Sequence, residues 1–133
     1  LCLRDIDLFK RFDTIEVGLS ITTDRDDIKK IFEPASPSVR SRLSALKTLH
    51  GEGINTYAFI GPLLPLDPLG LADSLKGIVD SVLIDKLNYP NKVKALYRRA
   101  RLNQYLEADY FTEAARLLKY NLEKAGVPVS VIF

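Results

Sequence analysis

The chain has 133 residues, of which 47% are hydrophobic and 27% charged, a composition typical of a soluble globular domain rather than of a disordered or fibrous protein. The 19 basic and 17 acidic residues leave a net charge of +2, too small an excess to indicate a nucleic-acid partner by itself. A single cysteine and a single histidine exclude an internal disulfide framework and a cluster of histidine ligands.

No apolar run reaches the ~18 residues that cross a bilayer, and no secretory signal is visible. We therefore expect a cytoplasmic protein with no membrane partner. The sequence begins with Leu1 and contains no methionine. A natural reading frame starts with methionine, so we expect a fragment or a processed form of a longer protein. No low-complexity linker interrupts the chain, and we expect residues 1–133 to form a single domain with a core of its own.

The first third of the chain predicts a helix, a strand and a second helix. Residues 3–12 have apolar side chains at helical spacing, which predicts a short helix without a strand before it. Apolar and polar residues alternate over 15–22, which predicts the first strand. Thr23 is placed to cap a short helix that Pro34 ends.

The middle of the chain predicts two further pairs of a helix and a strand. The Ser-Pro pair at 36–37 predicts the start of a helix, because proline suits the first helical position. Residues 55–60 predict the second strand, since the Gly-Pro pair at 61–62 breaks it. The Asp-Pro pair at 67–68 opens another helix, and a third strand is predicted within 81–87.

Two helices are predicted beyond Pro90, and the second carries a continuous apolar stripe that Gly126 ends. Residues 127–133 predict a fourth strand. Strands thus alternate with helices throughout, which implies right-handed crossovers and parallel pairing. We expect an α/β fold, namely a partial, half-barrel-like (β/α) barrel whose parallel sheet is covered by helices. Ligands bind at the carboxyl ends of parallel strands, so the residues to examine are 20–23, 60–65 and 85–88.

Several of these segments resemble a known family. The stretches LRDIDLFKRF, VGLSITT, FEPASPSVRSRLSALKTLHGEGI, FIGPLLP and VLIDKLN are similar to the second half of radical S-adenosylmethionine proteins, of the spore photoproduct lyase-like or DNA-repair-photolyase-like group. The resemblance covers residues 3–88. It implies a partial (β/α) barrel, a [4Fe-4S] cluster held by a C-x-x-x-C-x-x-C loop, and S-adenosylmethionine that is cleaved reductively to a 5′-deoxyadenosyl radical. This chain lacks the loop, because Cys2 is its only cysteine and is not part of such a motif.

The resemblance implies cofactor-binding roles for five residues. Ser20 and Thr22 would contact the ribose, and hydroxyl groups are suitable partners for ribose oxygens. Arg42 would hold the methionine carboxylate, since a guanidinium can clamp a carboxylate with two parallel bonds. Ile60 would contact the adenine, and Gly61 would permit close approach because it has no Cβ.

Each of these assignments has a structural alternative that the sequence leaves open. The two hydroxyls could line a solvated strand face, and residues 60–61 could be a plain transition from strand to loop. Arg42 could instead pair with a carboxylate of this chain, and Arg40 is a second candidate for the clamp. The carboxylates considered for Arg42 are those of Asp26, Asp27 and Glu33.

Three polar residues follow the third strand and are candidates for the substrate side of the site: Asp85, Lys86 and Asn88. A salt bridge between neighbours on the rim is the alternative. No catalytic residue can be identified. His50 precedes Gly51 and is typical of a helix end, where the dipole favours a cation, and no partner for catalysis by it is evident.

The helix predicted beyond Pro90 is rich in cations, namely Lys92, Lys94, Arg98, Arg99 and Arg101. Contacts with the phosphates of a nucleic acid are one interpretation, and a solvated charged face is the other. Tyr97 lies among these cations, where a base could stack, but it falls on the apolar stripe, which favours a core position.

Two classes of function follow. The first is the carboxyl-terminal part of a lyase-like radical S-adenosylmethionine enzyme, which would be inactive without the cluster loop. The second is a non-catalytic α/β module that binds a partner or a small ligand, and an unrelated (β/α)-barrel fragment is a third interpretation. A partial barrel also leaves two edge strands unpaired, and open edges invite pairing with another chain. We therefore expect either self-association, as a homo-oligomer, or helices that cover the edges.

Overall fold

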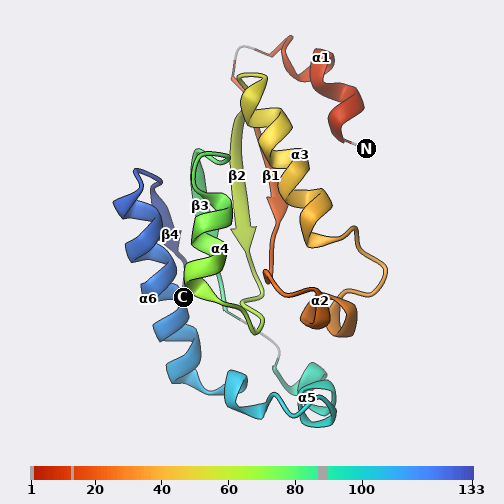
Figure 1. Ribbon diagram of the computed structural model, residues 1–133, viewed down its shortest axis with the longest axis vertical. Coiled ribbons are helices and arrows are strands. Elements are labelled where there is room, and N and C mark those ends of the chain that lie inside the picture. The colour runs from red at the N-terminus through yellow and green to blue at the C-terminus, as the bar shows by residue number, and fades with distance from the viewer. Residues whose placement is uncertain (1, 13, 87–89) are drawn as a thin grey trace.

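The computed structural model describes residues 2–12, 14–86 and 90–133 (Figure 1). Its strands are β1 (Glu16–Ser20), β2 (Asn55–Ile60), β3 (Ser81–Ile84) and β4 (Val129–Val131). The 3₁₀-helix η1 (Cys2–Asp5) and α1 (Ile6–Phe9) precede β1; α2 (Asp26–Phe32) and α3 (Val39–Gly51) follow it; α4 (Pro68–Leu75) joins β2 to β3; and α5 (Pro90–Arg99), η2 (Asn103–Leu106) and α6 (Ala108–Lys124) join β3 to β4.

The four strands form one parallel sheet in the order β1-β2-β3-β4. Neighbours in the sheet are also neighbours along the chain, so successive crossovers of the same hand place their helices on the same side. Figure 1 shows α3, α4 and α6 side by side in front of the sheet. The α/β fold with a parallel sheet is thus confirmed, and these three helices cover one of its two faces.

The main core lies between the sheet and these helices. Ala58 and Ile60 of β2 are fully buried there, whereas Tyr57 and Phe59 alternate with them on the opposite face and are only half-buried. Apolar burial of this kind contributes about 1.5–3 kcal/mol for each large side chain. This burial stabilises the packing of the helices on one face of the sheet. We call the opposite side the open face and define it by six residues in register across the sheet: Gly18, Ser20, Tyr57, Phe59, Leu83 and Ser130.

A second, smaller core lies beyond the carboxyl ends of the strands, where α2 and α5 are seen in Figure 1. Tyr97 of α5 is fully buried there, and its ring lies 4.8 Å from that of Phe32 in α2. The core position favoured for Tyr97 is therefore confirmed. Ile28, Leu64 and Leu102 complete this second core.

The helix starts differ from those predicted. The α3 helix begins at Val39, because Ser38 rather than Ser36 supplies the cap: its Oγ accepts a hydrogen bond from the Ser41 N–H at 3.0 Å. Such a cap contributes about 1 kcal/mol. Arg25 is the capping residue of α2. The Thr23 hydroxyl accepts from the Arg25 N–H at 3.1 Å and also donates to the carbonyl of Pro65 at 2.6 Å.

The amino ends of β2 and β3 are joined by a carboxylate. Asp80 Oδ2 accepts a hydrogen bond from the buried Thr56 N–H at 2.8 Å and lies 3.4 Å from His50 Nδ1 at the end of α3. The sequence suggested no partner for His50, and the structure places Asp80 beside it. This group lies at the opposite end of the sheet from the expected site, where side chains of a parallel α/β fold serve stability.

We expect Asp80→Ala to lower the free energy of unfolding by about 1–3 kcal/mol, because the buried Thr56 N–H would lose its acceptor. Urea denaturation at neutral pH measures the change. Asp73→Ala is the matched control, since within the described residues Asp73 pairs only with Lys76, on the exposed surface of α4, and such pairs contribute ~0–1 kcal/mol. Equal losses in the two variants would contradict a structural role for Asp80.

Candidate functional site

The strand register gathers side chains from all four strands into one row near the carboxyl end of the open face. Ser20 is paired with Phe59, Phe59 with Leu83, and Leu83 with Ser130. The row therefore has an aromatic and an aliphatic side chain at its centre and a hydroxyl at each end. Such a surface can contact the flat face of a ring and hydrogen-bond to polar groups at its borders.

Two glycines make room for the aromatic rings of the open face. A Cβ built on Gly18 would overlap the Tyr57 ring on the adjacent strand, and one built on Gly61 would come within 2.6 Å of the Phe59 ring. Neither approach is possible for real atoms, so a side chain at either position would displace the ring. The close approach expected at Gly61 is made in this structure by Phe59 of the same chain.

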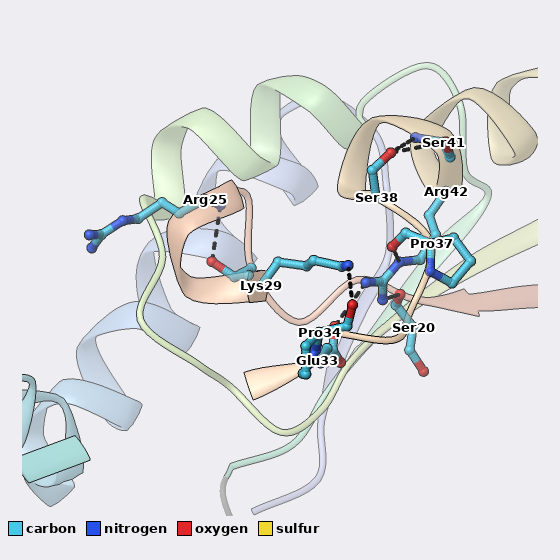
Figure 2. A network of polar contacts seen from close by, with 10 residues as sticks. Ser20, Arg25, Lys29, Glu33, Pro34, Pro37, Ser38, Ser41 and Arg42 are labelled. Atoms are coloured by element: carbon cyan, nitrogen blue, oxygen red, sulfur yellow. Dashed lines mark hydrogen bonds and ion pairs between the residues drawn. The ribbon is translucent and has the colours of Figure 1, made fainter. Parts of the chain in front are cut away.

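Arg42 ties the loop between α2 and α3 to the end of β1. Its guanidinium donates to the Ser20 carbonyl at 2.9 Å, to Glu33 Oε2 at 2.8 Å and to the Pro37 carbonyl at 3.2 Å (Figure 2). The arginine side chain is 11% exposed and that of Glu33 is 21% exposed. The pair is thus shielded from water. Of the three carboxylates considered for Arg42, Glu33 is the one with which it pairs.

The loops that follow β1 and β2 are joined to each other. Besides the bond of Thr23 to Pro65, the Leu64 N–H donates to the Thr22 carbonyl at 3.3 Å, and the Asp67 N–H donates to Asp24 Oδ1 at 2.9 Å. Both loops run along the carboxyl edge of the sheet. They therefore form a connected wall at the end of the open face.

Thr22 has a buried hydroxyl without a hydrogen-bond partner. The residue is 2% exposed, and within the described residues nothing bonds to its Oγ1. Most buried polar atoms in proteins are paired, and leaving one unpaired costs about 1–3 kcal/mol. A group that supplied the missing bond, whether from a ligand or from another chain segment, would recover this free energy.

The structure brings some of the predicted cofactor-binding residues together and separates others. Ser20 and Arg42 meet through the backbone carbonyl, and Gly61 lies one strand away from them. The contact expected from Ile60 needs correction, because this side chain has no exposed surface and lies in the main core. The side chain that β2 presents on the open face at this level is that of Phe59.

The residues after β3 are only partly described. The Asp85 N–H donates to the Ile60 carbonyl at 3.0 Å, which continues the ladder one residue beyond β3. Asp85 Oδ1 accepts from the Lys86 N–H at 2.8 Å, and Lys86 Nζ lies 5.8 Å from the centre of the Phe133 ring. Asn88 lies outside the described residues. Asp85 and Lys86 thus stand at the expected edge of the sheet.

Ionisable and aromatic side chains lie in the second core and next to it, at this edge of the sheet. Burial raises the pKa of Tyr97 to about 12, and burial also raises the pKa of Tyr110, whose hydroxyl donates to the Leu64 carbonyl at 2.7 Å. A hydrogen bond from the Arg25 side chain lowers the pKa of the Asp27 carboxyl. Since Tyr97 is fully buried, it offers no surface on which a base could stack among the exposed cations of α5, which include Lys94, Arg98 and Arg99.

A groove of about 790 Å³ lies beside the outer edge of β1. It is lined by Leu3 of η1, Leu19 of β1 and the first turns of α3, with Arg40 and Arg42 among its residues. Its volume is typical of a small-molecule site. However, Leu19 belongs to the side of the sheet that packs on the helices, so this groove and the open face are separate surfaces.

The described part of the chain has neither a cluster of metal ligands nor a membrane-spanning helix. In the described ranges 2–12, 14–86 and 90–133, no three His, Cys, Asp or Glu side chains are grouped so that they could hold a metal ion. Within the same ranges, every helix is too short or too polar to span a bilayer.

Comparisons with known proteins give one partial match. No family model and no solved structure matches the chain. A protein of Methanocaldococcus jannaschii named "Uncharacterized protein MJ0683" is 55% identical over 65 residues, which are 49% of this chain and 25% of that protein. The similar segment thus spans a quarter of the relative's length, and the relative is about twice as long as this chain.

Sequence reasoning missed the aromatic pair of the open face. Tyr57 and Phe59 alternate with Ala58 and Ile60, and this period of two places both rings on one side of the strand. The alternation itself was the signal that could have identified them. Glu33 was named only as one of three carboxylates for Arg42, and nothing local in the sequence distinguishes it from the other two.

Proposed function

We propose that the chain is a segment of a radical S-adenosylmethionine enzyme, in which the sheet is part of a partial (β/α) barrel and the open face receives S-adenosylmethionine. The winding of the sheet supports this proposal. A doubly wound sheet reverses its strand order and places helices on both faces, whereas a barrel keeps the strand order sequential and its helices outside. The open face would then correspond to part of a barrel interior.

The observation that carries the proposal is the combination of groups at the carboxyl end of this face. Phe59 offers a half-buried ring to stack on adenine, and Ser20 offers an exposed hydroxyl beside it. Phe59 and Ser20 would bind and orient the nucleoside. The unpaired Thr22 hydroxyl lies two residues further along the chain but is 2% exposed, so it would bond to a ribose only after the loop that follows β1 opens.

The iron-sulfur cluster used by such enzymes does not fit the residues of this chain. Thiolates hold such clusters, and the sequence has one cysteine. The share of the reaction proposed for this chain is limited to cofactor binding, with Asp85 and Lys86 on the substrate side of the rim.

Titration of the ¹⁵N-labelled chain with S-adenosylmethionine tests the binding that this proposal requires. We expect amide shifts to change at Ser20, Thr22, Phe59 and Gly61, at the carboxyl ends of the strands, and to remain fixed at the amino ends. Phe59→Ala should raise the Kd for S-adenosylmethionine about 5- to 150-fold, because a stacked ring contributes about 1–3 kcal/mol. Leu69→Ala on α4 is the control. Shifts confined to other surfaces, or none at millimolar cofactor, would refute the proposed site.

The enzymatic part of the proposal requires the missing cluster loop. The test uses a longer protein that contains this chain and a C-x-x-x-C-x-x-C loop. After anaerobic reconstitution of its cluster, addition of S-adenosylmethionine and a reductant should release 5′-deoxyadenosine. Absence of this product from fully clustered protein would refute the enzymatic function, whatever the outcome of the binding titration.

One observation favours the alternative of a non-catalytic binding module. Arg42, which the resemblance places at the methionine carboxylate, already holds Glu33 and two backbone carbonyls. A cofactor carboxylate would have to compete with Glu33 or use the remaining N–H groups of the guanidinium. Titration of Glu33→Gln distinguishes the two: binding that tightens in this variant indicates competition for Arg42, and unchanged binding indicates that Arg42 is structural.

A further inference from the structure

The two edges of the sheet have backbone groups that point away from their neighbours. On β4, the Val82 N–H donates to the Pro128 carbonyl and the Ile132 N–H donates to the Ile84 carbonyl, both at 3.0 Å. Bonding direction alternates along a strand, so Val129 and Val131 direct their N–H and C=O groups outward. The hydrogen bond from Lys119 Nζ to the Val129 carbonyl agrees with this assignment.

The β1 edge has the same property. The Ile21 N–H donates to the Phe59 carbonyl at 3.0 Å, so the odd-numbered residues bond to β2, and Gly18 and Ser20 direct their backbone groups outward. The bond from Arg42 to the Ser20 carbonyl comes from this outer side. Each edge thus has one outward carbonyl, of Ser20 or Val129, that accepts a hydrogen bond from a cationic side chain. The N–H of an added strand could take the place of that cation.

The strands run in one direction, and this restricts what can pair with the edges. A two-fold axis parallel to the strands keeps all strands parallel, and it brings the β4 edge of one copy beside the β1 edge of another. Two such contacts join the four strands of one copy to the four strands of the other. The resulting eight strands are the number in a closed (β/α)₈ barrel. The open faces then become the barrel interior.

The helices agree with this closure. Each strand is preceded by a helix, in the pairs α1–β1, α3–β2, α4–β3 and α6–β4. In a sequential barrel, each helix covers the junction between its own strand and the previous one. Figure 1 shows α1 beyond α3 on the β1 side of the sheet, where a junction with β4 of a second copy would be covered.

Most of the exposed large apolar side chains adjoin the two edge strands along the chain. Within the described residues, eight such side chains are exposed, and five of them precede β1 or follow β4 in sequence: Leu3, Leu8, Phe12, Ile132 and Phe133. The groove lined by Leu3 and Leu19 is also beside the β1 edge. Exposed apolar patches of this kind mark interaction surfaces.

We propose that two copies of this chain, by themselves, close into one eight-stranded parallel barrel through reciprocal pairing of β4 with β1. The occupant of each edge is a second copy of the same chain. This proposal does not rest on the proposed function. A segment that carried the cluster loop and its own strands would compete with the second copy for these edges.

Light scattering after size exclusion tests the assembly at 5–200 µM protein. We expect a mass twice the 14.9 kDa of the chain. Val131→Pro removes an outward N–H. An edge strand tolerates this loss in a monomer, but a ladder between two copies does not, so the variant should have half the mass of the dimer. Leu8→Asp, at 51% exposure, should do the same, whereas Leu69→Asp on α4, at 53% exposure, should leave the dimer intact.

Hydrogen exchange on the unmodified chain provides a test that needs no variant. The Gly18 and Val131 amides should become protected as protein concentration rises, because both point into the proposed ladders. A monomer at 200 µM would overturn the proposal. So would a dimer that resists both edge variants, fast exchange of these amides in the dimer, or open oligomers that keep growing with concentration.

Discussion

Replacement of Arg42 by methionine is expected to lower the free energy of unfolding by about 2–3 kcal/mol. The substitution keeps an unbranched apolar stem but removes the bonds to Ser20, Glu33 and Pro37. Hydrogen bonds to charged groups contribute about 1.5–3 kcal/mol, and the loss also leaves the shielded carboxylate of Glu33 without its partner. Urea denaturation followed by circular dichroism measures the effect.

Arg40→Met is the matched control, because Arg40 is an exposed arginine on the same helix and its replacement changes the net charge by the same amount. It should change stability by less than ~0.5 kcal/mol. Adding Glu33→Gln to Arg42→Met should recover part of the loss, since the unpaired charge is removed. Equal losses in the Arg40 and Arg42 variants would show that charge, not the three bonds, stabilises the loop between α2 and α3.

The order of strands and helices could be predicted because both have strong periodic signals. Apolar residues alternate in β1 and β2, and the stripe of α6 recurs at helical spacing, so the type of each element follows from local sequence. Boundaries were less certain because nearby residues compete for the same role. Ser36 and Ser38 are both suitable caps, and the bond to the Ser41 N–H selects Ser38.

The site was predicted less well, because its contacts join residues that are distant in sequence. Alternation shows that Phe59 and Ile60 face opposite sides of β2, but it does not show which side the helices cover. Arg42 had three carboxylates to choose from, and the path of the loop after α2 places Glu33 next to it. The unpaired hydroxyl of Thr22 depends on the packing of two loops, and no local pattern shows it.

Tyr97→Phe is expected to leave stability at neutral pH unchanged or to raise it by up to about 2 kcal/mol. The Tyr97 hydroxyl is buried and has no hydrogen-bond partner within the described residues. Its removal therefore eliminates the free-energy cost of taking an unpaired hydroxyl out of water. Tyr110→Phe is the matched comparison, because the Tyr110 hydroxyl donates to the Leu64 carbonyl at 2.7 Å. Losing that bond should cost about 1–3 kcal/mol. Thermal and urea denaturation should therefore show a loss of stability in Tyr110→Phe and none in Tyr97→Phe.

The same hydroxyl makes stability depend on alkaline pH. Burial raises the pKa of Tyr97 to about 12, whereas an unfolded chain has the ordinary tyrosine pKa of about 10. Since the unfolded chain releases this proton more readily, stability is complete below pH ~10 and falls as the pH rises toward ~12. This difference in pKa corresponds to about 3 kcal/mol. Urea denaturation from pH 8 to pH 12 should show a smaller loss in Tyr97→Phe than in the unmodified chain, and parallel curves would mean that the Tyr97 hydroxyl ionises as freely in the folded state as in the unfolded one.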